Sequence, residues 1–149
     1  TALARLAEGL QVILKRAADQ NVVIGFEPEP GKYAESMNHF ARMLQWIQHP
    51  NLGLTLDIGH LYCLGEVPLA DYIQRWGEML VNVHLQDMKA GIHEHLMFGE
   101  GEMDFAPVID AISKTGYRGG VHVELSRHSH AAVVSAQKAF NFLKPLWPS

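Results

Sequence analysis

The stretch LGLTLDIGH (residues 52–60) predicts a β-strand that ends in a carboxylate. Leu54 and Leu56 alternate with a glycine and a threonine, so one face of the strand is aliphatic and the other is small or polar. Asp57 lies on the second face, at the point where the apolar run stops. We therefore expect the strand to pack its leucines against helices and to present Asp57 at its carboxyl end.

Three other stretches have the same design, and each predicts a strand. They are VVIGFE (22–27), LVNVHL (80–85) and GVHVEL (120–125), and they place Glu27, His84 and Glu124 at or within one residue of their ends. Counting back in twos from each of these residues predicts a small or polar face. In the stretch that ends near His84, this face holds Asn82 and Leu80, and Val81 falls on the apolar face. The same alternation of the two faces holds in all four strands. It predicts that four potential metal ligands meet at one end of a sheet.

Helical periodicity fills the segments between these strands. Apolar residues recur at intervals of three and four over residues 3–19, 36–48, 69–79, 104–115 and 131–143. Ser36, Pro68 and Asp104 stand where helix starts are expected. A strand–helix repeat of about 30 residues is typical of βα units, which form parallel sheets with right-handed crossovers. The predicted fold is α/β, a parallel (β/α) barrel with functional residues at the carboxyl ends of the strands.

The predicted convergence creates an electrostatic problem. Glu27, Asp57 and Glu124 would bring three negative charges into one pocket, where repulsion and lost hydration are costly unless a cation compensates them or some of the acids are protonated. Three carboxylates and the neutral imidazole of His84 form a mostly oxygen shell. Such a shell suits Mn²⁺, Mg²⁺ or Co²⁺ in octahedral geometry, with Zn²⁺ as a further option. We predict a divalent metal with coordination positions open to substrate.

Composition narrows the classes of function. The 149 residues are 48% hydrophobic, which suits one globular domain, and 12 basic against 16 acidic side chains give a net charge of −4. No cluster of Lys or Arg marks a nucleic-acid surface, and apolar runs of about five residues are far shorter than the ~20 that span a bilayer. Cys63 is the only cysteine, which excludes an internal disulfide framework and favours a reducing, cytoplasmic location.

Together these motifs resemble the xylose isomerase-like TIM barrels, which include sugar and sugar-phosphate isomerases and epimerases, inosose dehydratase and AP endonucleases. FEPEPG (26–31), LDIGH (56–60), VHLQD (83–87) and VHVEL (121–125) are similar to the family's motifs after its fifth to eighth strands, and HLMFGEGEMDF (95–105) is similar to its His followed by Gly-x-Gly. The resemblance implies that the metal ligands are Glu27, Asp57, His84 and Glu124. It also implies that His60 contacts substrate. Glu29 is a rival ligand, but Glu27 keeps the strand phase.

The resemblance implies that residues 1–149 form one domain, which corresponds to the carboxyl-terminal half of such a barrel. Family barrels have eight strands and about 250 residues. This chain supplies what resemble strands five to eight, and it opens at Thr1 inside a helical pattern. A half barrel would expose two sheet edges and much apolar surface. We expect either a missing amino-terminal half or self-association to close the sheet.

The loop after the third strand adds histidines near the expected metal. In the AP endonuclease branch, an Asp-x-His pair here joins the histidine of Asp-x-x-His to hold another zinc, and the corresponding triplet is His93, Glu94 and His95. His60, His93 and His95 could form a three-imidazole zinc site. We favour instead the interpretation that His60, His95 and Lys89 hydrogen-bond substrate hydroxyls or a phosphate. A solvated position in the loop is the alternative for His93.

Three other features of this region carry expectations. Gly99 and Gly101 would allow a tight turn over the pocket. Arg127 follows Glu124 closely enough to reach an anionic substrate, and a surface role is the alternative. His122 is expected to face the interior below Glu124 as a hydrogen-bonded core residue.

The leading hypothesis from the resemblance is a divalent-metal-dependent sugar or sugar-phosphate isomerase or epimerase. The metal would stabilise an enediolate while Glu27 and Glu124 act as base and acid, and Asp57 and His84 would anchor the ion. The alternatives are an AP endonuclease-like zinc phosphodiesterase, a dehydratase of the inosose type and a non-catalytic sugar-binding module. The acidic balance and the histidine in place of aspartate weigh against the phosphodiesterase, and we expect no nucleic-acid or membrane partner.

Overall fold

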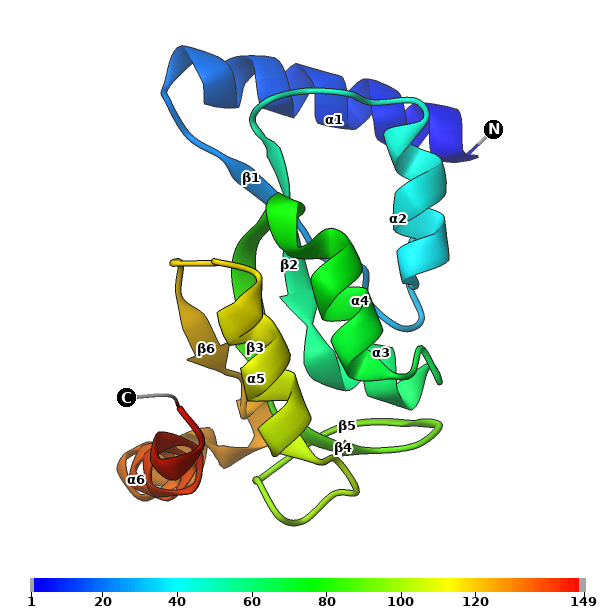
Figure 1. Cartoon of the computed structure of the whole chain (residues 1–149). Helices are drawn as coiled ribbons and strands as arrows, with labels where there is room; N and C mark the ends of the chain where they lie inside the picture. The colour runs from blue at the N-terminus through cyan, green and yellow to red at the C-terminus, as the bar shows by residue number, and fades with distance from the viewer. Residues whose placement is uncertain (1, 148–149) are drawn as a thin grey trace.

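The computed structural model describes residues 2–147, in which helices and strands alternate (Figure 1). The α-helices are α1 (Ala2–Asp19), α2 (Met37–Leu44), α3 (Ile58–Cys63), α4 (Leu69–Trp76), α5 (Phe105–Lys114) and α6 (Ala132–Leu143). The strands are β1 (Ile24–Phe26), β2 (Leu52–Asp57), β3 (Leu80–Leu85), β4 (Asp87–Lys89), β5 (Ile92–Leu96) and β6 (Val121–Val123). Short 3₁₀ helices cover Gly77–Met79, Ser126–Ala131 and Lys144–Leu146. Within residues 2–147, every helix is too short or too polar to cross a membrane.

The main sheet is parallel and has the strand order β1-β2-β3-β6, which confirms the predicted α/β fold. Asp57 lies beside His84 and His84 lies beside His122, so the carboxyl ends of β2, β3 and β6 are level, whereas β1 ends at Phe26, opposite Leu54. Within the described part of the chain, β1 and β6 each pair on one side only, and both are shorter than the predicted strands at 22–27 and 120–125. β2, which pairs on both sides, is buried over its whole length.

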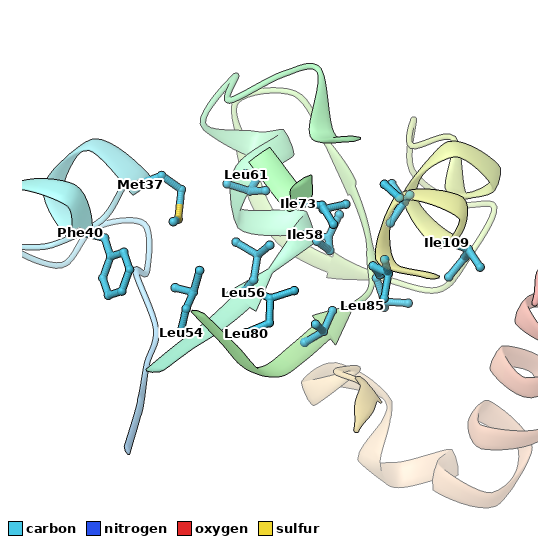
Figure 2. Close-up of a cluster of buried hydrophobic side chains, with 14 of the residues drawn as sticks. Met37, Phe40, Leu54, Leu56, Ile58, Leu61, Ile73, Leu80, Leu85 and Ile109 are labelled. Carbon is cyan, nitrogen blue, oxygen red and sulfur yellow. The ribbon is translucent and has the colours of Figure 1, made fainter. Parts of the chain in front are cut away.

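The hydrophobic core includes buried side chains from the sheet and from all six α-helices, and Figure 2 shows its part beside α2, α3, α4 and α5. Its most buried members have at most 1% of their surface exposed. The strands contribute Leu54, Leu56, Val83 and Leu85, and the helices contribute Phe40, Ile73 and Ile109. Burial stabilises the fold by roughly 1.5–3 kcal/mol for each side chain of this size. This packing anchors the strands whose ends carry the polar side chains described below.

The opposite, inner face of the sheet is lined mainly with small side chains. At the start of β3, the predicted assignment of residues to the two faces is wrong. The register between β2 and β3 shifts there, as a β-bulge requires. Leu80 is consequently buried in the core, and Val81 lies on the inner face. A Cβ added to Gly25 or Gly53 would clash with the methyl groups of Val81, so these glycines make room for the bulged residue.

β4 and β5 form an antiparallel hairpin where the sequence predicted only a glycine-punctuated loop. Lys89 pairs with Ile92, and the turn between them contains Gly91 with a φ of +71°. This positive φ is available to glycine at little cost. The hairpin packs beside α3 and carries His93 and His95 on β5.

Asp87 organises the loop that follows the hairpin. Its side chain is 1% exposed, and its carboxylate accepts the backbone N–H groups of Met88 (2.9 Å), Gly99 (2.8 Å), Gly101 (2.9 Å) and Met103 (3.2 Å). A Cβ added to Gly101 would clash with this carboxylate, and Gly99 has a φ of +89°. The tight turn predicted at Gly99 and Gly101 is present, and its centre is the carboxylate of Asp87.

Candidate metal centre

The four parallel strands bring four potential ligands to one end of the sheet. Asp57 ends β2 and caps α3, and His84 lies beside it in β3. Glu27 follows β1 by one residue. Glu124 follows β6 by one residue and donates its backbone N–H to the carbonyl of Leu85 at 3.0 Å. One ligand atom from each of the four side chains lies within 4.8 Å of the other three.

His84 Nδ1 stands at the middle of this cluster. It is 3.1 Å from Glu27 Oε1, 2.9 Å from Glu124 Oε2 and 3.8 Å from Asp57 Oδ2. The two edge strands provide the glutamates from opposite sides, and the two central strands provide the aspartate and the histidine. The strand phase therefore predicted the convergence of these side chains.

The carboxyl group of Asp57 is the most buried member of the cluster, with a fully covered side chain. Burial raises the pKa of Asp57 to about 6, although hydrogen bonds from Gln86 and from the backbone of His60 oppose the shift. The negative charge of Glu27 raises this pKa further. A buried acid of this kind ionises more readily when a positive charge lies close to it.

The pKa values of His84 and Glu27 shift in opposite directions, and each shift favours the charged form of the residue. The hydrogen bond to Glu27 raises the pKa of His84, and the surrounding carboxylates add to this effect against the opposing effect of burial. Burial raises the pKa of Glu27, but the hydrogen bond and the charge of His84 outweigh it, so the pKa of Glu27 lies below its ordinary value of 4.5. The cluster therefore attracts positive charge, either as a proton on His84 or as a metal ion.

The donor set fits a divalent metal. Three carboxylates and one imidazole make an oxygen-rich shell, which suits Mn²⁺, Mg²⁺ or Co²⁺. It differs from the thiolate ligands of a structural zinc site. The side chains of Glu27 and Glu124 are 31% and 38% exposed, so these two members of the cluster are accessible to solvent. Among the described residues, the cluster includes Glu27 rather than Glu29.

Three histidines form a second group beside the first. His93 Nε2 lies 3.1 Å from His60 Nε2 and 3.4 Å from His95 Nε2. The Nδ1 atoms of His60 and His95 are each 3.2 Å from a backbone carbonyl oxygen, of Pro28 and Glu124 respectively. A carbonyl only accepts, so the Nδ1 atoms of His60 and His95 donate, and their Nε2 lone pairs face Nε2 of His93. Burial lowers the pKa of both His60 and His93, which favours neutral imidazoles and the chemistry of a three-imidazole metal site.

Three predicted residues lie outside these two groups. Lys89 is exposed on β4. Arg127, with 66% of its side chain exposed, donates to the carboxylate of Glu94. The prediction that His122 is a hydrogen-bonded core residue is wrong, because β6 is an edge strand and leaves this side chain exposed. The His122 ring lies edge-on to that of His84, at 6.4 Å between centroids.

Two amides on β3 and just beyond its end were not predicted as functional. The amide of Asn82 lies 2.9 Å from His84 Nε2, on the side of the ring away from the carboxylates. Gln86 Nε2 donates to both carboxylate oxygens of Asp57, at 2.7 and 2.9 Å. The signal was present in the sequence, because Asn82, His84 and Gln86 are two apart and therefore share a face.

Comparisons with known proteins show which family this chain matches and which individual proteins it is similar to. A family model described as xylose isomerase-like TIM barrel matches residues 1–146. The inosose dehydratase of Lacticaseibacillus casei is 27% identical over 137 residues, which cover 80% of this chain and 46% of that protein. The L-ribulose-5-phosphate 3-epimerase UlaE of Escherichia coli is 24% identical over 141 residues, covering 94% of this chain and 49% of that one. The crystal structure of a D-tagatose 3-epimerase-like protein matches with a TM-score of 0.81 and 25% identity, covering 97% of this chain and 55% of that one. The chain spans about half the length of the curated relatives it matches.

Proposed function

Because this chain belongs to the xylose isomerase-like TIM barrel family, we propose that it forms the metal-binding part of a sugar or sugar-phosphate isomerase or epimerase. The observation that carries the proposal is the convergence of Glu27, Asp57, His84 and Glu124 at the ends of four parallel strands. The similarity to a D-tagatose 3-epimerase-like protein and to a ribulose-phosphate epimerase supports the reaction class. A divalent ion held by these residues, with Mn²⁺ as first choice, would supply stabilisation of negative charge on a substrate oxygen.

Glu27 and Glu124 are the residues that we propose move the substrate proton. They approach the cluster from opposite edge strands, and both side chains are accessible to a substrate. The hydrogen bond with His84 lowers the pKa of Glu27, so Glu27 is a carboxylate at neutral pH and can accept a proton. Glu124 would return a proton on the other side. Asp57 and His84, on the central strands, would anchor the ion.

Proton exchange with solvent tests these roles. The complete polypeptide is incubated with Mn²⁺ and a panel of ketoses and ketose phosphates in D₂O, and NMR follows the hydrogen on the carbon next to the carbonyl. The wild type should exchange this hydrogen, and Glu124→Gln should abolish the exchange with the fold intact. Glu100→Gln changes an exposed glutamate in the same way and should exchange normally. Normal exchange in Glu124→Gln would overturn its role.

A dehydratase is the second candidate, because an inosose dehydratase is among the similar proteins. Proton removal next to a carbonyl begins this reaction too, and a hydroxyl on the following carbon then leaves as water. Mass spectrometry of the products separates the candidates. An isomerised or epimerised sugar keeps the mass of the substrate, whereas a dehydrated product is lighter by one water molecule.

His60 and His95 are proposed to bind substrate hydroxyls or a phosphate, with Lys89 and Arg127 as further contacts. The alternative is a second metal held by His60, His93 and His95, which the AP endonuclease-like reaction would require. The convergent Nε2 atoms can hydrogen-bond substrate hydroxyls or, as neutral imidazole nitrogens, bind zinc. Elemental analysis of the purified complete protein distinguishes the two roles. One ion per chain supports substrate binding, and two or more support the second site.

We also propose that the sheet is closed either by further βα units of the same polypeptide or by a second copy of the chain. Among residues 2–147, β1 and β6 are open edges, and each is flanked by exposed apolar side chains. Val12 and Ile13 of α1 are 72% and 52% exposed beside β1, and Phe140 of α6 is 57% exposed beside β6. Sedimentation of the complete polypeptide separates the two, since a monomer supports closure by its own units and a dimer supports closure by a second copy.

A further inference from the structure

Gln86 holds the carboxylate of Asp57 in one orientation. Its side chain is fully buried, and its Nε2 donates to Asp57 Oδ1 at 2.7 Å and to Oδ2 at 2.9 Å. Asp57 Oδ1 also accepts the backbone N–H of His60 at 2.8 Å. Two donors therefore share Oδ1, and Oδ2 is the oxygen that faces His84 Nδ1, at 3.8 Å. The hydrogen bonds thus fix the orientation of the carboxylate, with Oδ2 on the side of His84 Nδ1.

The contact between Gln86 and Asp57 depends on Gly59. A Cβ added to Gly59 would lie 2.7 Å from Gln86 Nε2 and 2.8 Å from the terminal methyl of Met88. Any larger residue at position 59 would push the amide away from Asp57. The motif LDIGH therefore combines a carboxylate, the backbone donor of His60 and a glycine that admits Gln86.

Packing alone does not explain the choice of glutamine at this position. Gln86 Oε1 is buried without a hydrogen-bond partner among the described residues, which is unfavourable for stability. An apolar side chain of the same length would fill the space without burying an unpaired carbonyl. The neutral amide instead supplies a donor to Asp57 and adds no positive charge that would compete with a cation.

We propose that Gln86 is a positioning residue of the metal centre, which orients Asp57 so that its Oδ2 atom faces the bound ion. This inference rests on the metal site proposed above. Partners of this kind that fix a ligand's orientation typically change metal affinity 10- to 100-fold when they are removed.

Metal binding by Gln86→Met tests the proposal, because methionine has a similar length and no donor. Mn²⁺ is titrated into the complete polypeptide and followed by electron paramagnetic resonance, and the visible spectrum of the Co²⁺-loaded protein reports the ligand geometry. We expect the Kd for Mn²⁺ to rise about 10- to 100-fold and the Co²⁺ bands to shift. Gln74→Met, at an exposed position on α4, is the matched control and should change neither.

An unchanged Kd and an unchanged Co²⁺ spectrum in Gln86→Met would overturn the positioning role while leaving the metal site itself supported. Failure of the wild type to bind Mn²⁺ would instead refute the proposed site and this inference with it. Gln86→Asn keeps the amide and withdraws it by one methylene group, so it provides a second variant if the methionine variant does not fold. The same weakening is expected for Gln86→Asn, and wild-type affinity in it would count against the proposal.

Discussion

An Asp57→Asn variant isolates the electrostatic cost of the buried carboxylate. Burial raises the pKa of Asp57 from 3.8 to about 6, a shift of roughly two units that corresponds to about 3 kcal/mol. Because the folded protein holds this proton more tightly than the unfolded chain does, the stabilising contribution is complete below pH 3.8 and is lost as the pH rises through about 6. Near neutral pH the metal-free wild type carries this cost, whereas asparagine stays neutral and avoids it.

Urea denaturation in the presence of a chelator, at pH values from about 4 to 7.5, measures the effect. The quantity to compare at each pH is the free energy of unfolding of the wild type minus that of the variant. Glu27 and His84 titrate in both proteins, so their contributions largely cancel in this difference. This difference should fall by about 3 kcal/mol over the pH range. Saturating Mn²⁺ at neutral pH should stabilise the wild type far more than the variant. A difference that does not vary with pH would refute the burial argument, and equal stabilisation by Mn²⁺ would refute Asp57 as a ligand.

Three further substitutions test other parts of the structure. Asp87→Asn removes the acceptor for two of the four backbone N–H groups that Asp87 binds, so it should lower the free energy of unfolding by about 3 kcal/mol. The control Glu100→Gln, at an exposed position, should change this free energy by less than about 0.5 kcal/mol. Ser36→Ala removes the side-chain cap of α2 and should cost about 1 kcal/mol in the same assay. Arg127→Ala breaks an exposed ion pair and should cost less than about 1 kcal/mol, but it should raise KM for phosphorylated sugars more than for unphosphorylated ones. Equal KM changes for both kinds of sugar would show that Arg127 does not bind the phosphate.

The convergence of Glu27, Asp57, His84 and Glu124 was predictable because it depends on local rules. Side chains two apart share a face of a strand, and neighbouring parallel strands bring their carboxyl ends to one edge of the sheet. The alternation in LGLTLD therefore identified Asp57, and the same count identified His84. The family resemblance added the expected fold, and the structure agrees with it.

Other features depend on contacts between distant segments, which no local pattern contains. Val81 moves to the inner face because Gly25 and Gly53 on neighbouring strands leave space for it. Asp87 reaches the N–H groups of a loop that begins some ten residues later in the chain, a distance that no capping rule covers. His122 is exposed because its strand has a neighbour on one side only among residues 2–147.

The position of bound Mn²⁺ in crystals of the complete polypeptide, located by anomalous scattering, tests the metal centre most directly. We predict one strong peak within about 2.0–2.6 Å of carboxylate oxygens from Glu27, Asp57 and Glu124 and of His84 Nδ1. A peak bonded to other side chains, or the absence of any peak among these four at saturating Mn²⁺, would contradict it.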